Sequence, residues 1–514
     1  MRVPTSPRWL AALLVGGASL TLYVLTLAPT ITWANFGTDG GDLISAAATL
    51  GIPHPPGYPL YVTLGFVFAQ LPIGPVAFRL NLFSAVCMAL AAAIIAWSVT
   101  TPDKGLGMGA RILAGLAFAA APLVWGQATL AEVHALSALL VALTLGLLAP
   151  AAFNTEVLST RRLALACFVW GLSCTHQPTA LALAPLFFVA VRRSLVTHSS
   201  SLTTRHALRI TQYALLFLLP LSLNLLLLLR AAAQPPVNWL GEATLANAWS
   251  LITAQIYRGY AFGVPLSDYP ARLVALAQLW VAQFGWLGVG LIAWGIYRNG
   301  RRIIAPLMSA ALYTIFVLGY HTVDSQLYLI PVCLLGAYAL AAGAHDLSLY
   351  AARFAHRLSL ATRHSSLFTR HALRSTYYAS LLFLIPGLSV INSYAAQDLH
   401  ADQRAEVFAQ TTLAAAPDDA IVITHLDAHT FTLWYYRLVE EQRPDVVIID
   451  ARLAAYPWYD PMLRAQDARR AQNQSLIEVD FDPEETWLAR LRAANPARPL
   501  CEVEPTSAQL VCQP

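Results

Sequence analysis

The sequence predicts an α-helical polytopic membrane protein that ends in a small α/β domain. Of its 514 residues 57% are hydrophobic and only 12% are charged, and long apolar runs recur as far as about residue 396. Soluble domains usually carry about a quarter charged residues. The formal net charge is only +4, and no basic patch is interleaved with aromatic residues. Nucleic acid is therefore not an expected partner, whereas the lipid bilayer is.

Apolar runs long enough to cross a bilayer make up residues 1–396, the predicted transmembrane domain. At about 20 residues per crossing we count roughly eleven spans, near residues 9–28, 75–100, 111–128, 132–150, 163–178, 179–191, 211–231, 271–297, 303–320, 326–344 and 376–396. The first run resembles a signal peptide, but the many later spans favour an uncleaved helix. Residues 58–72 are shorter, so we expect them to be re-entrant or interfacial.

The distribution of basic residues predicts the orientation in the membrane. Cytoplasmic loops carry an excess of Lys and Arg. With a cytoplasmic N-terminus these loops contain Lys104, Arg111, Arg161, Arg162, Arg192, Arg193, Arg205, Arg209, Arg298, Arg301, Arg302, Arg353, Arg357, Arg363, Arg370 and Arg374. The loops 29–57 and 232–270 and the tail from 397 then lie outside the cytoplasm. We expect an integral protein of the plasma (inner) membrane.

The tail, residues 397–514, has the pattern of an extracytoplasmic α/β domain. Two buried-strand patterns, 420–424 and 445–450, flank a helical one at 430–441, which predicts a β-α-β unit. In an oxidising compartment Cys501 and Cys512 can form a disulfide, and two free thiols are the alternative. The run from His425 to His429 invites a metal-site interpretation, but Asp and His are also common at helix ends, and we favour the structural role.

The first predicted outer loop, residues 29–57, contains the candidate catalytic residues Asp39, Asp42 and His54. Proline and glycine in this loop favour one fixed backbone shape. Ionisable residues beside a membrane span indicate function more often than ordinary loop structure. On a short helix the two carboxylates share a face, so one can act as a general base. The other can orient a substrate or share a divalent cation, although two acids are too few to predict a metal site.

Two further polar groups are candidates for substrate binding. Glu132 and His134 lie at the outer end of a predicted span, where a simple polar turn is about as good an explanation. Arg258 and Tyr260 lie in the second outer loop, and an arginine there is well suited to a lipid phosphate. The alternative is an ordinary interfacial arginine.

Taken together, these motifs resemble the transmembrane protein 260-type family, multi-pass proteins linked to protein O-mannosylation. The resemblance covers most of the chain and runs through Asp39-Gly-Gly-Asp42, His54-Pro-Pro-Gly-Tyr-Pro-Leu-Tyr61, Arg79-Leu-Asn-Leu-Phe-Ser-Ala85, Ala131-Glu-Val-His-Ala-Leu136, Gly171-Leu-Ser-Cys-Thr-His176, Arg258-Gly-Tyr260, Asp324-Ser-Gln-Leu-Tyr-Leu-Ile-Pro331, Arg443-Pro-Asp-Val446 and Pro457-Trp-Tyr459. The His-Pro-Pro-Gly-Tyr-Pro run is the most specific. This chain departs from the family at two places. The family usually has Glu at the position of Asp42, so an acid is preserved there. It usually has an Asn-Asp-Thr-Phe-like run where this chain has His425 to Phe431.

The resemblance implies a GT-C type membrane glycosyltransferase that takes a mannose-like sugar from a polyprenyl-phosphate donor on the outer face. It implies that Asp39 is the base, that Asp42 and His54 support it, and that Arg258 faces the lipid phosphate. Tyr58, Glu132, His134 and Tyr260 would then help to bind substrate. The expected partners are the lipid-linked donor and a protein or glycan acceptor, with no cofactor, although a divalent cation is not excluded.

Two other classes of function stay open at this stage. A transporter or flippase of a lipid-linked or small polar substrate would also place polar residues at helix ends. Against it, the chain has no long inverted repeat of whole helices. A non-catalytic membrane assembly factor, which binds a partner through its tail, is the other alternative. A transfer assay with a polyprenyl-phosphate sugar separates the three.

Overall fold

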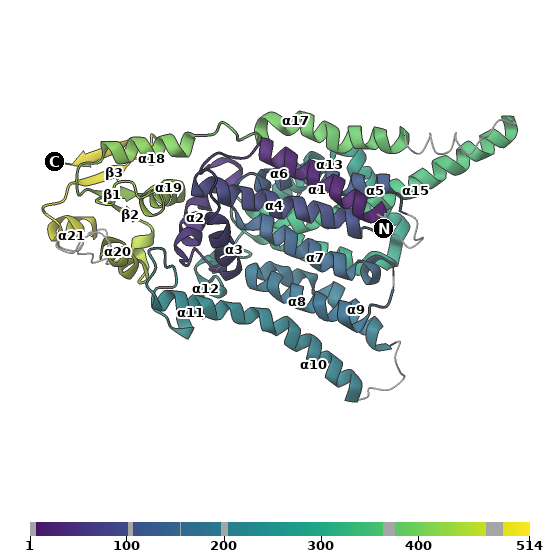
Figure 1. The fold of residues 1–514 in the computed structure, drawn as a ribbon, viewed down its shortest axis with the longest axis horizontal. Coiled ribbons are helices and arrows are strands. Elements are labelled where there is room, and N and C mark those ends of the chain that lie inside the picture. The colour runs from purple at the N-terminus through teal and green to yellow at the C-terminus, as the bar shows by residue number, and fades with distance from the viewer. Residues whose placement is uncertain are drawn as a thin grey trace.

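The computed structural model describes residues 7–100, 106–154, 156–196, 204–362, 376–468 and 487–513. A bundle of long helices fills most of the molecule, and a small domain with a β-sheet lies beyond one end of it (Figure 1). Three of the arginines used for the orientation, Arg363, Arg370 and Arg374, lie outside the described residues.

The bundle follows the predicted apolar runs closely. Its helices are α1 (Pro7–Leu25), α4 (Val76–Ser98), α5 (Met108–Ala119), α6 (Pro122–Ala128), α7 (Val133–Asn154), α8 (Thr160–His176), α9 (Ala184–Val196), α10 (Thr204–Leu218), α11 (Leu225–Ala232), α13 (Tyr269–Asn299), α14 (Ile304–Gly319), α15 (Ile330–Thr362) and α17 (Leu388–Gln397). The α-helical membrane fold is thus confirmed.

The number of spans that are long enough by themselves is smaller than the predicted eleven. Among the described residues eight helices are long and apolar enough to cross a membrane, or nine if the bent pair α5 and α6 is one span. The other two predicted runs form α8 and α14, which have only 17 and 16 residues. The predicted run 163–178 is itself short for a crossing, and α14 begins and ends one residue inside the predicted run 303–320.

Helix α4 lies at the centre of the bundle and packs against α1, α5 and α7. Alanines such as Ala85, Ala92 and Ala96 are buried along it. Small side chains let helix backbones approach closely, which is how helices associate where no water is present to drive them together. The bundle therefore provides a rigid base for the segments at its end.

The two predicted outer loops lie together at the end of the bundle that faces the C-terminal domain. The first loop folds into η1 (Ala34–Asp39), α2 (Gly40–Thr49) and, after a turn, α3 (Pro59–Ala69). The second contains α12 (Leu245–Ile252), η4 (Gln255–Tyr260) and η5 (Leu266–Asp268). The start of α1 and the far ends of α10 and α15 lie at the opposite end (Figure 1).

The C-terminal domain contains the predicted β-α-β unit. Strand β1 (Ile421–Thr424) is followed by α19 (Asp427–Leu438) and by β2 (Val447–Asp450), which pairs parallel to β1. Strand β3 (Leu500–Val503) is parallel to β1 on its other side, and β4 (Leu510–Gln513) closes the sheet antiparallel. The remaining elements are α18 (Arg404–Ala415), η9 (Leu453–Ala455), α20 (Tyr459–Ala468) and α21 (Trp487–Ala494). Both faces of β1 and β2 are buried, as in other parallel sheets.

The predicted disulfide is present. Cys501 on β3 and Cys512 on β4 are opposite each other in the antiparallel pair and are joined by a disulfide. The cysteines of the helical bundle, Cys87, Cys167, Cys174 and Cys333, are buried and free.

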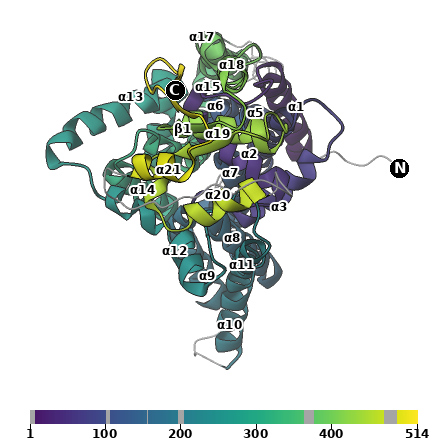
Figure 2. The same cartoon turned by 90° about the vertical axis from the view of Figure 1, so that its left-hand side faces the viewer.

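The C-terminal domain packs directly on the first loop through α19 and α2, and in Figure 2, where this domain faces the viewer, α19 lies in front of α2. The contact is so close that a Cβ on Gly41 would overlap the backbone of Phe431. The indole N–H of Trp33 donates hydrogen bonds to the Ala428 carbonyl, at 3.1 Å, and to Thr432 Oγ1, at 2.9 Å. The domain is therefore joined to the candidate catalytic loop itself.

We predict that Gly41→Ala loosens this contact. Helix propensity alone would favour Ala at this helical position by up to about 1 kcal/mol. The overlap with the Phe431 backbone acts in the opposite direction and destabilises the folded protein, because overpacking typically costs about 1–3 kcal/mol. The measurement is the midpoint of thermal unfolding, together with proteolytic release of the C-terminal domain. Gly17→Ala is the matched control, because a Cβ there meets nothing within 4 Å. Equal behaviour of the two variants would contradict the contact.

Candidate active site

A large cavity lies where the two predicted outer loops, the ends of several bundle helices and the C-terminal domain meet. Its volume is about 1620 Å³. Seven of the eight candidate site residues line it, namely Asp39, His54, Tyr58, Glu132, His134, Arg258 and Tyr260. Residues from distant parts of the sequence are thus brought to one place.

The eighth candidate, Asp42, lies behind the cavity wall and is fully buried. Its Oδ2 accepts hydrogen bonds from the backbone N–H of His54, at 2.9 Å, and from the ring Nδ1 of the same residue, at 2.8 Å. Its Oδ1 accepts one from the indole N–H of Trp239, at 3.0 Å. Both carboxylate oxygens are therefore used to hold neighbours in place.

His54 lies between the two acids. Its Nδ1 faces Asp42, and its Nε2 is 3.7 Å from Oδ2 of Asp39. Asp39 is the residue before α2 and Asp42 is in the first turn, where the helix dipole favours negative charge. The side chain of Asp39 is 38% exposed and lines the cavity, so it is the member of the pair that can reach a substrate.

The protonation states follow from this arrangement. Burial raises the pKa of Asp39 to about 6, although His54 opposes the shift. Burial lowers the pKa of His54, but the carboxylates of Asp39 and Asp42 outweigh it and raise the pKa to about 9. Near neutral pH the site therefore holds a carboxylate beside an imidazolium. A carboxylate whose pKa is close to the working pH is well suited to act as a general base.

Glu132, His134 and Tyr58 form one wall of the cavity. Glu132 is only 4% exposed, and its Oε1 has no hydrogen-bond partner among the described residues. Burial raises the pKa of Glu132 well above its ordinary value, which favours the neutral carboxyl. The ring of Tyr58 packs edge-on against His54, at 5.3 Å between centroids, and His134 packs similarly against Tyr328.

Arg258 and Tyr260 line the cavity from η4 of the second loop. Both are exposed. Within the described part of the chain Arg258 has neither an ion pair nor a hydrogen bond for its guanidinium. By contrast, Arg272 of α13, which also lines the cavity, donates to the carbonyls of Val317, Leu318 and Tyr320. Arg258 is therefore the arginine of the cavity that is available to an anion.

Sequence reasoning missed three residues of the site. Trp239 gave no signal, because its role depends on packing beside Asp42. Asp324 lies in a segment that we quoted for the resemblance, but we gave it no role, and it lines the cavity. Asp427 also lines the cavity, from the C-terminal domain. A sequence pattern does not reveal that this domain reaches the loop.

The side chains of the His425–His429 run have separate partners. Nε2 of His425 is 2.6 Å from Glu502, Asp427 pairs with Arg452, and His429 stacks on Phe408. Among the described residues no group of three or more His, Cys, Asp or Glu side chains is placed to hold a metal ion.

The fold is similar to two solved structures of ArnT from Cupriavidus metallidurans. One, bound to undecaprenyl phosphate, matches with a TM-score of 0.52 and 12% sequence identity over 86% of this chain and 91% of that one. The other, in the apo state, has a TM-score of 0.52 and 14% identity over 86% and 90% of the two chains. This likeness confirms the GT-C-like fold class.

Curated relatives carry one common name. The "Protein O-mannosyl-transferase TMEM260" of Mus musculus is 27% identical over 449 residues, which are 83% of this chain and 61% of the relative. The protein of the same name in Dictyostelium discoideum is 22% identical over 487 residues, 85% of this chain and 56% of the relative. The chain thus spans less than two thirds of the length of either relative.

Two family models match the chain, one in the bundle and one in the tail. The "Protein O-mannosyl-transferase TMEM260 N-terminal domain" matches residues 39–199, beginning at Asp39. The "TMEM260-associated domain 2" matches residues 405–486. In both regions the chain is thus similar to the transmembrane protein 260-type proteins, which confirms the resemblance that its motifs predict.

Proposed function

We propose that this protein is a membrane glycosyltransferase that moves a mannose-like sugar from a polyprenyl-phosphate donor to an acceptor hydroxyl, with Asp39 as the general base. The observation that carries the proposal is the position of Asp39. Its carboxylate is exposed to the cavity, beside an imidazole that is itself fixed by a buried acid.

The donor is proposed from the chemistry of the opposite wall. The guanidinium of Arg258, which has no partner in the described part of the chain, suits the phosphate of a lipid-linked sugar. Arginine binds phosphate through paired, charge-assisted hydrogen bonds. Supporting this, the structurally similar ArnT has been solved with undecaprenyl phosphate bound. The names of the curated relatives support a mannose-like sugar and a protein acceptor.

The proposed step is a single displacement. Asp39 accepts the proton of the acceptor hydroxyl, whose oxygen forms a bond to the anomeric carbon of the sugar. The bond between that carbon and the phosphate oxygen breaks, and the electron pair leaves with the polyprenyl phosphate. Arg258 stabilises the charge on the leaving phosphate, and the imidazolium of His54 stabilises the ionised form of Asp39. The step assigns no role to a metal ion.

Asp39→Asn is expected to lower the transfer rate by about 10²–10⁴-fold, because asparagine is nearly isosteric but cannot take up the proton. Donor affinity should be retained. Asp42→Asn should cost less, since Asp42 orients His54 and does not line the cavity. Arg258→Ala should instead raise the KM for the donor. The measurements are the transfer rate and donor affinity of purified protein with a radiolabelled polyprenyl-phosphate sugar.

The control for these variants is Asp460→Asn, which removes an acid from α20, where it pairs with Arg464. It should transfer sugar at the normal rate. Near-normal turnover by Asp39→Asn would reject this loop as the catalytic centre and would return attention to a transporter or an assembly factor.

The pH dependence of transfer follows from Asp39. The base must be ionised, so kcat/KM should fall as the pH drops through about 6, where Asp39 takes up a proton. Because the positive charge of His54 lowers the pKa of Asp39, His54→Gln should move this acidic limb to higher pH. His400→Gln, an exposed histidine paired with Asp398, should leave the limb in place. A limb that is unchanged in His54→Gln contradicts the assignment.

We propose that the cavity end of the bundle faces the outside of the plasma (inner) membrane. The arginine distribution supports this orientation, and so does the disulfide, which is typical of oxidising compartments. Ala414 is exposed on α18 and Ala207 is exposed near the opposite end, on α10. In intact cells an impermeant thiol reagent should label Ala414→Cys and spare Ala207→Cys. The reverse pattern would overturn the orientation.

A further inference from the structure

Resting on the proposed function, we propose that Asp427 of the C-terminal domain orients the acceptor in the catalytic cavity, and that Arg452 positions Asp427. The acceptor group that Asp427 would bind is a hydrogen-bond donor, namely the main-chain N–H of a polypeptide next to the reacting hydroxyl. The C-terminal domain would then be part of the active site and would select the acceptor.

The first support is the place of α19 at the cavity. Asp427 and Phe431, one turn apart on this helix, both line the cavity that contains Asp39. The carboxylate of Asp427 is near enough to contribute to the raised pKa of Asp39. The contact of α19 with Gly41 and Trp33 holds this helix against the loop that carries Asp39. These contacts place Asp427 and Asp39 on the walls of the same cavity.

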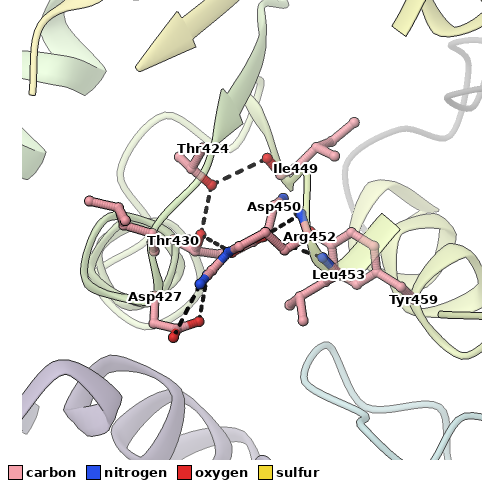
Figure 3. Close-up of polar contacts among 9 residues, drawn as sticks. Thr424, Asp427, Thr430, Ile449, Asp450, Arg452, Leu453 and Tyr459 are labelled. Carbon is pink, nitrogen blue, oxygen red and sulfur yellow. Dashed lines mark hydrogen bonds and ion pairs between the residues drawn. The ribbon is translucent and has the colours of Figure 1, made fainter. Parts of the chain in front are cut away.

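The second support is the network that holds Asp427, which Figure 3 shows at the carboxyl ends of β1 and β2. Arg452 Nη2 donates to Asp427, at 2.6 Å, and to Asp450, at 2.9 Å. Asp450 is fully buried, and it also accepts from Thr430 Oγ1, at 2.6 Å, and from the backbone N–H of Arg452, at 2.8 Å. A buried carboxylate with this many partners is a fixed anchor.

The two aspartates that Arg452 joins differ in their exposure to solvent. The side chain of Asp450 is fully buried, whereas that of Asp427 is 43% exposed. A purely structural clamp has no need to present a carboxylate to the cavity. The oxygens of Asp427 retain lone pairs beyond their bonds to Arg452, because each carboxylate oxygen accepts about two hydrogen bonds.

The wall around Glu132 is also suited to a bound ligand. It holds a carboxyl group that is more than nine-tenths buried and whose Oε1 has no partner among the described residues. The cavity thus has carboxyl groups on two sides. One side belongs to the bundle and the other to the C-terminal domain.

The test is the steady-state kinetics of the full-length protein with a polyprenyl-phosphate mannose donor and a serine- and threonine-containing peptide. Asp427→Ala should raise the KM for the peptide by about 10- to 100-fold, which corresponds to the usual contribution of a hydrogen bond to a charged group. The KM for the donor should stay within twofold. Arg452→Lys should raise the peptide KM by a smaller factor, and Asp427→Glu should restore part of the loss.

Asp418→Ala is the matched control, because Asp418 is an exposed acid of the same domain that pairs with Arg443 away from the cavity. It should leave both KM values unchanged. If Asp427→Ala unfolds, the isosteric Asp427→Asn takes its place with the same expected direction. A peptide KM that stays within twofold of wild type in the folded variant overturns this inference and leaves the proposed function standing. Absence of any sugar transfer by the wild-type protein overturns both.

Discussion

The hydrogen bonds of the buried Asp42 are the constraint on which the rest of the site depends. They join three segments that are separate in the sequence, namely α2, the turn that contains His54, and the loop that contains Trp239. Removing one partner from a buried charged group leaves that group unsatisfied, which is far more costly than losing a surface contact. The shape of the cavity wall is therefore fixed from behind, by a residue that does not touch the cavity.

The two acids, which form one pair in the sequence, have different positions in this arrangement. Asp42 is fully buried and positions His54, whereas Asp39 is exposed to the cavity and free to act on a substrate. His54 connects them and keeps a positive charge beside Asp39. The close contact between Gly41 and Phe431 adds the C-terminal domain to the same unit. The tail and the loop are thus joined through the contact of α19 with α2.

Much of this fold could be predicted because its signals are local. Apolar runs marked the helices of the bundle, and two buried-strand patterns around a helix marked the β-α-β unit of the tail. The turn at Gly57, which has a φ of 86°, needs glycine and was visible as part of the Pro-Gly-rich run. The site residues were predicted as separate groups, and the structure brings seven of the eight together in one cavity.

The features that could not be predicted depend on contacts between segments that are distant in the sequence. No local pattern distinguishes Asp39 from Asp42, because their difference lies in burial behind Trp239. Likewise, Asp427 has the sequence context of a helix start, and only the packing of α19 on α2 takes it to the cavity. The predicted run 303–320 is also slightly longer than α14, since hydropathy does not mark the exact residue at which a helix ends.

The most direct test of the account is a structure of the purified protein with a polyprenyl phosphate bound. The account predicts that the phosphate lies inside the cavity, within hydrogen-bond distance of the Arg258 guanidinium, about 3 Å, on the same side of the membrane as Asp39. A phosphate bound at the arginine-rich end of the bundle, or outside the cavity, would contradict it.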